Sequence, residues 1–150
     1  MSTPYQKLVD EQAAVMGVQP LPVVTENEGS AATDMSHLFI NPSFASELHQ
    51  SSGEAGLRFV VAHELGHARG GAGGGHEGEL SADRWAAHSL VHAGLGPEAI
   101  DGVMAKLDST PTESHPGPAQ RQSHARAAWA AAFDAKALAR TSDVDRGRDR

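Results

Sequence analysis

Residues 63–67 carry the pattern His-Glu-x-x-His. On a helix, His63 and His67 stand one turn apart on the same face, so both imidazoles can reach one ion. Glu64 is offset from that pair and can lie beside a metal-bound water without ligating the metal. Catalytic zinc takes three protein ligands and keeps a fourth position for water or substrate. The pattern therefore predicts a mononuclear zinc site, with one Zn²⁺ per chain.

Glu79 is the expected third ligand. A glycine-rich turn at residues 70–75 follows the histidines and lets the chain reverse, so the next helix can bring a carboxylate against them. Asp83 lies one turn beyond Glu79, where we expect it to accept a hydrogen bond from the second ring nitrogen of a ligand histidine. His76 and Glu77, in or beside the turn, are alternatives for the third ligand.

This set of residues predicts a zinc-dependent endopeptidase that acts on a peptide or protein substrate. Zinc in such a site lowers the pKa of its bound water to about 7. Glu64, as general base, can take a proton from the zinc-bound water as it attacks the peptide carbonyl and pass it to the leaving amine. The alternative is a zinc-binding regulatory, toxin or zymogen-like module with restricted or no turnover. Nine histidines in the chain also leave open a chance pair on an ordinary helix.

The composition limits the other possibilities. With 12 Lys and Arg against 19 Asp and Glu, the formal charge of −7 argues against nucleic acid as a partner. Cysteine is absent, so the ligands of any metal must be histidine and carboxylate side chains. No apolar run could span a bilayer and no signal peptide is recognisable, which predicts a soluble protein without membrane insertion, cytoplasmic by default. Export without a signal stays open, as does the oligomeric state.

The chain is expected to form one α+β metallopeptidase domain over residues 1–139, followed by a charged tail at 140–150 that frays. A small mixed or antiparallel sheet, arranged as a meander, should pack on the H-E-x-x-H helix, with the E-x-x-A-D helix crossing beside it. The expected helices cover about residues 4–16, 43–50, 51–69, 77–92, 97–107 and 119–139, and the expected strands cover 22–26, 30–33 and 36–41.

Three motifs in order resemble the HtpX-like and CAAX-prenyl-protease-like family of gluzincin metallopeptidases. They are H-E-L-G-H at 63–67, E-x-x-A-D at 79–83, and Ser114-His115-Pro116 with Arg121 five residues after the proline. The resemblance covers roughly residues 20 to 125. It implies a zincin (gluzincin) fold in which His63, His67 and Glu79 hold the zinc. Many members carry transmembrane helices, so this chain looks like a minimal version.

The resemblance also implies roles outside the zinc ligands. The family's edge strand, along which the peptide substrate lies, corresponds here to Leu38, Phe39, Ile40 and Asn41. His115 would stabilise the oxyanion on the attacked carbonyl or act as a removable fourth ligand of the zinc. Arg121 could reach the same position beside the oxyanion.

Overall fold

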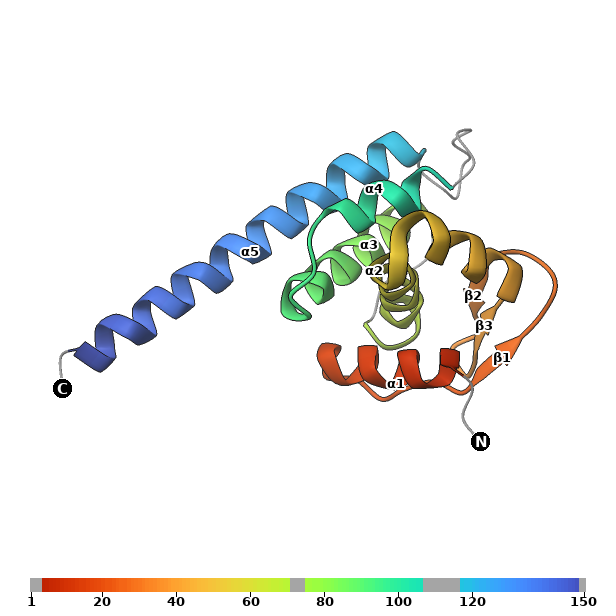
Figure 1. Cartoon of the computed structure of the whole chain (residues 1–150), viewed down its shortest axis with the longest axis horizontal. Coiled ribbons are helices and arrows are strands. Elements are labelled where there is room, and N and C mark those ends of the chain that lie inside the picture. Colours follow the sequence, from red (N-terminus) through yellow and green to blue (C-terminus); the bar gives the residue numbers. More distant parts are fainter. Residues whose placement is uncertain (1–3, 71–74, 107–116, 149–150) are drawn as a thin grey trace.

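The computed structural model describes residues 4–70, 75–106 and 117–148, with side chains up to residue 141. These ranges hold five helices and three short strands (Figure 1). The helices are α1 (Pro4–Met16), α2 (Pro42–Arg69), α3 (Gly75–His92), α4 (Glu98–Met104) and α5 (Pro118–Arg148), and the strands are β1 (Val23–Thr25), β2 (Ala31–Thr33) and β3 (Leu38–Ile40). The mixture of helices with a small sheet confirms the α+β expectation, whereas the zincin fold stays a prediction.

Helix α2 carries the two histidines of the motif and contacts α1, α3, α4 and the sheet. It begins after Asn41, whose side-chain oxygen accepts a hydrogen bond from the backbone N–H of Ser43 at 3.0 Å. Gly53 interrupts it with a φ of 68° and a ψ of −168°. The two helices expected on either side of residue 51 therefore form one element with a kink. After the kink, large apolar side chains such as Phe59 and Leu65 are buried, which fixes the orientation of the motif.

Helix α3 packs directly against the second half of α2 (Figure 1). A Cβ atom placed on Gly66 would lie 3.2 Å from the Cβ of Trp85 and 3.4 Å from the Cα of Ala82. A side chain at this position would therefore push the helices apart. Gly66, between the two histidines, lets α3 approach closely enough to bring its carboxylates to them.

The sheet is mixed, with the strand order β1-β3-β2. Strand β1 runs parallel to β3, and β2 runs antiparallel to it. The expectation of a meander is therefore wrong, because a meander would place β2 between its neighbours. The central position goes to β3, which is the strand whose side chains are most buried: Leu38 is 0% exposed and Ile40 1% exposed.

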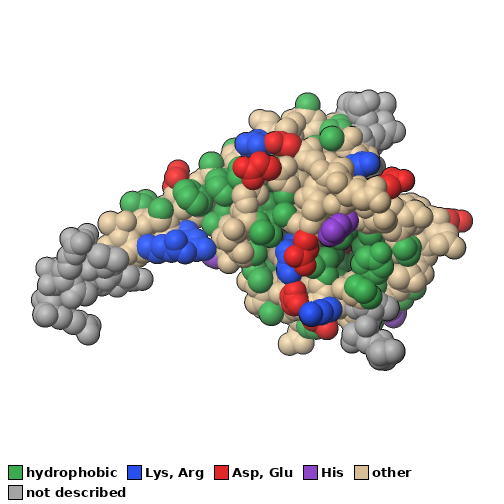
Figure 2. Space-filling view, viewed as in Figure 1, with side chains coloured by type: hydrophobic (Ala, Val, Ile, Leu, Met, Phe, Trp, Pro, Cys, Tyr) green, Lys and Arg blue, Asp and Glu red, His purple; other side chains and the backbone are tan. Residues whose placement is uncertain are grey.

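Helix α5 packs on α3 and α4 and then extends away from the body of the molecule (Figure 1). Its Trp129 donates a hydrogen bond from Nε1 to the backbone oxygen of Leu95 at 3.1 Å. Hydrophobic side chains continue along the extended part (Figure 2), and there Phe133 and Leu138 are exposed.

The helix runs to Arg148, about nine residues beyond the expected end, in a segment without proline, the strongest helix breaker. The division into a domain and a frayed tail stays a prediction. Among the described residues, no helix combines the length and apolar character that crossing a bilayer requires.

Candidate metal centre

The structure brings His63, His67 and Glu79 together into one cluster that could hold a metal ion, with candidate ligand atoms all within 4.8 Å of one another. The Nε2 atom of His63 lies 3.2 Å from Oε2 of Glu79, and the Nε2 atom of His67 lies 3.1 Å from Oε1. Ligand atoms about 2.0–2.1 Å from a tetrahedral zinc lie roughly 3.3 Å apart. The donors and their spacing therefore fit zinc.

The positions of these ligands follow from α2 and α3. One helical turn separates His63 from His67, and their rings meet edge to face with centroids 4.8 Å apart. Glu79 lies on the second turn of α3, where the close contact at Gly66 holds it against the histidines. Among the described residues, the cluster does not include His76 or Glu77. The geometry favours Glu79 over these two alternatives.

Asp83 lies directly behind His63. It is 0% exposed, and its Oδ1 atom accepts a hydrogen bond from Nδ1 of His63 at 2.8 Å. This bond places the proton on Nδ1 and leaves Nε2 as the atom that faces Glu79 and the metal position. The contact is the one expected from the sequence.

Arg121, at the start of α5, binds the same carboxylate. Its Nε atom donates to Oδ2 of Asp83 at 2.7 Å, and its Nη2 atom donates to Oδ1 at 2.8 Å. Nη2 also lies 3.8 Å from Oε2 of Glu79. The structure thus places Arg121 in the site with its guanidinium on Asp83, a partner that sequence reasoning missed. A role for Arg121 at the oxyanion stays a prediction.

The charges of the cluster depend on one another. Burial lowers the pKa of His63, but hydrogen bonds to Asp83 and Glu79 outweigh it and raise the pKa to about 9. Burial raises the pKa of Glu79, and hydrogen bonds from His63 and His67 more than offset this, so its pKa falls below the usual range. Without metal, His63 is therefore protonated at neutral pH and bridges two carboxylates. A metal ion must displace the proton on Nε2.

Glu64 lies beside the cluster without belonging to it. Its Oε1 atom is 4.0 Å from Nε2 of His63, and the residue is 9% exposed. Within the described parts of the chain, its carboxylate forms no hydrogen bond, and burial raises its pKa. A buried carboxylate of raised pKa and free lone pairs next to a metal position is suited to accept a proton.

The residues expected to bind substrate lie on the central strand of the sheet and at the start of α2. Strand β3 is paired on both sides, so the expectation that it is an edge strand is wrong. Leu38 and Ile40 are core residues, Phe39 is partly buried, and Asn41 caps α2. Their role in substrate binding stays a prediction. His115 lies outside the described residues.

Comparison of the chain with protein-family models, curated proteins and solved structures found no match. Function must therefore be inferred from the geometry of the cluster and its surroundings.

Proposed function

We propose that the chain is a zinc-dependent endopeptidase in which Glu64 is the general base. The proposal rests on the proximity of two different groups in one partly buried place. Two histidines and one carboxylate face each other at zinc-ligand spacing, and the carboxylate of Glu64 lies 4.0 Å from the nearer histidine. An ion bound there meets three protein ligands, as catalytic zinc sites require.

Zinc held by His63, His67 and Glu79 would supply Lewis acidity, which lowers the pKa of a water and polarises a carbonyl. Residues of the chain transfer the proton and hold the ligands in position. Glu64 accepts a proton from the attacking water at its carboxylate and returns it to the leaving amine. Asp83 keeps the proton of His63 on Nδ1, and Arg121 holds Asp83 in place through two hydrogen bonds.

A peptide in extended form would need a strand edge beside the site. Strands β1 and β2 form the two edges of the sheet, and both β2 and the central β3 contact α2. The edge that packs on the motif helix is therefore β2, with residues Ala31–Thr33. We expect the substrate backbone to pair there, since strand addition supplies regularly spaced hydrogen bonds without regard to sequence.

The test compares wild type with Glu64→Gln, loaded with zinc, on a mixture of unfolded protein substrates analysed by mass spectrometry. Glu47→Gln is the matched control, because Glu47 is an exposed glutamate on the same helix. We expect Glu64→Gln to keep its zinc and lose at least about 100-fold in cleavage rate, as general-base catalysis contributes about that much or more. Glu47→Gln should cleave like wild type.

Two results would overturn the proposal. The first is zinc-loaded wild type that cleaves no substrate in the mixture, which would favour a binding module. The second is cleavage by Glu64→Gln at the wild-type rate, which would assign the activity to another site or to a contaminant.

A further inference from the structure

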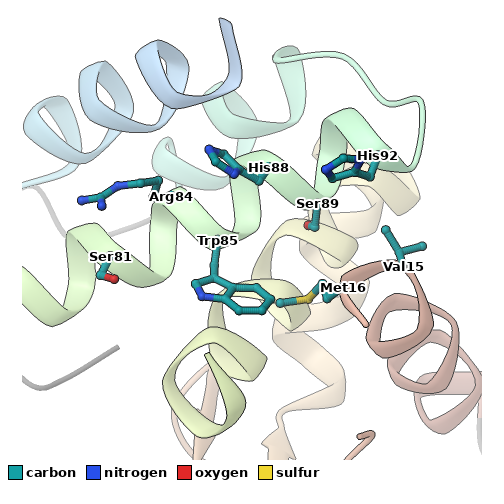
Figure 3. A pocket seen from close by; sticks show the side chains of 8 residues that line it. All are labelled: Val15, Met16, Ser81, Arg84, Trp85, His88, Ser89 and His92. Atoms are coloured by element: carbon teal, nitrogen blue, oxygen red, sulfur yellow. The ribbon is translucent and has the colours of Figure 1, made fainter. Parts of the chain in front are cut away.

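A hollow of about 540 Å³ lies between the end of α1 and α3 (Figure 3). Val15 and Met16 line it from α1, and the other lining residues come from α3. At 3.6 residues per turn, these α3 residues lie on the face opposite Glu79 and Asp83. The volume is within the range of about 300–1,000 Å³ typical of small-molecule pockets.

Three basic side chains, Arg84, His88 and His92, follow one another at four-residue intervals along this hollow (Figure 3). In the described parts of the chain, none of the three forms an ion pair with a carboxylate, although the protein carries a net charge of −7. Burial lowers the pKa of His88, and the nearby His92 and Arg84 lower it further. A carboxylate bound beside His88 would favour the protonated form of its imidazole and would pair with the guanidinium of Arg84.

The opposite side of the hollow is apolar. Met16 points toward the indole of Trp85, and Val15 lies beyond it (Figure 3). The indole is held in place by a hydrogen bond from Nε1 to the backbone oxygen of Gly70 at 3.3 Å. A fixed aromatic ring offers contact area at little cost in side-chain entropy. Basic groups on one side and an aromatic surface on the other complement a ligand with both an anionic and an apolar end.

We propose that this hollow binds an organic carboxylate that carries an aromatic or branched apolar group. Its carboxylate meets Arg84, His88 and His92, and its apolar group rests on Trp85 and Met16. This chemistry occurs both in free carboxylic acids and in the C-terminal residue of a peptide. A metal ion is disfavoured, because within the described residues His88 and His92 belong to no group of three metal-ligating side chains. The proposal does not depend on the metal centre.

The test is a titration of the metal-free protein with 3-phenylpropionate, followed by the backbone and indole N–H signals in NMR spectra. We expect saturable shifts at Val15, Met16 and Trp85. The neutral isostere 3-phenylpropionamide should bind at least about 5-fold more weakly, because it cannot form an ion pair with the guanidinium of Arg84. A tripeptide of two glycines and a C-terminal phenylalanine tests whether peptides bind as well. If the tripeptide with a free carboxyl group binds and its amidated form does not, the hollow accepts peptide C-termini as well as free acids.

Variants of exposed residues localise the effect without disturbing the core. Arg84→Gln and His88→Gln should each raise the Kd for 3-phenylpropionate by about 2- to 5-fold, the range for exposed ion pairs. Lys7→Gln, an exposed residue on the other side of α1, should leave the Kd unchanged. Equal affinity for acid and amide, no saturable binding, or shifts centred on His63 and His67 would overturn the proposal. So would binding that requires added zinc.

Discussion

Asp83 joins α5 to the metal centre through a single carboxylate. It is fully buried, and it accepts hydrogen bonds from both His63 and Arg121. A buried charge that loses its partner costs several kcal/mol, more than the pair contributes when intact. The sequence indicated the bond to His63, because residues one turn apart on a predicted helix share a face. It did not indicate Arg121, which lies 38 residues further along the chain.

Replacing Asp83 by Asn should weaken zinc binding by about 10- to 100-fold, the usual effect of losing the group that orients a ligand histidine. Arg121→Gln should also weaken zinc binding, and the double variant should be no weaker than Asp83→Asn alone, because the arginine acts through the aspartate. Competition titrations against a zinc indicator measure all three affinities.

A different outcome would assign Arg121 to the oxyanion. In that case Arg121→Gln would retain zinc at wild-type affinity and lose turnover by roughly 100-fold or more, the effect of removing one oxyanion donor. Additive losses of zinc affinity in the double variant would contradict the coupling through Asp83.

Kinetics of His115→Ala test the two roles expected for His115. A lower kcat indicates a donor to the oxyanion, and a higher activity indicates a removable fourth ligand of the zinc.

At the scale of elements, the contact between α2 and α3 determines whether Glu79 reaches the histidines. Gly66→Ala adds a Cβ at 3.2 Å from that of Trp85, tighter than an ordinary contact. Alanine is a better helix former than glycine by about 1 kcal/mol, so stability can change in either direction. We expect zinc affinity to fall even where the melting temperature is kept, because the shift of α3 moves Glu79. Unchanged zinc affinity would mean that α3 does not depend on this close approach.

The contact between α4 and α5 should stabilise the protein less at acidic pH. Asp101 accepts hydrogen bonds from Gln122 at 2.6 Å and from Nε of Arg126 at 2.8 Å. The Arg126 and Gln122 bonds lower the pKa of Asp101 from 3.8 to about 2. A folded-state pKa below the unfolded value stabilises the protein above about pH 4, and this contribution disappears as the pH falls through about 2.

Asp101→Asn should therefore lower the melting temperature slightly at pH 7, since exposed pairs contribute at most about 1 kcal/mol, and the difference from wild type should vanish near pH 2. Asp134→Asn is the control, because Asp134 is exposed on α5, the helix that carries Arg126, and, in the described residues, forms no ion pair. Thermal melts across this pH range measure both. A difference that persists unchanged at pH 2 would show that the carboxylate charge is not responsible.

The elements themselves were more predictable than their arrangement. Helices α1 and α3 follow from caps, apolar spacing and terminal glycines, all of which are local. The order of the strands places the most buried strand, β3, in the centre, and burial depends on tertiary packing that local sequence signals do not give. A stretch such as Leu38–Ile40 looks the same in sequence at the centre of a sheet and at its edge, so its central position could not be predicted from the sequence.

At the scale of the whole molecule, the metal centre depends on the first part of α5 and not on its extended end. Lys136 donates a hydrogen bond from Nζ to the backbone oxygen of Val91 at 3.1 Å, which ties this part of α5 to α3. A chain that ends after residue 139 should keep its zinc affinity and melt within a few degrees of the full chain. Calorimetry and zinc titration check this. Loss of zinc from this shorter chain would show that the extended end belongs to the domain.

Whether His63, His67 and Glu79 hold one zinc ion can be measured directly as zinc stoichiometry, by native mass spectrometry on purified variants. We expect one zinc per chain in wild type, at least a tenfold loss of affinity in Glu79→Ala, and wild-type zinc content in His88→Ala and His92→Ala. Wild-type affinity in Glu79→Ala, or an empty site after removal of His88 or His92, would contradict it.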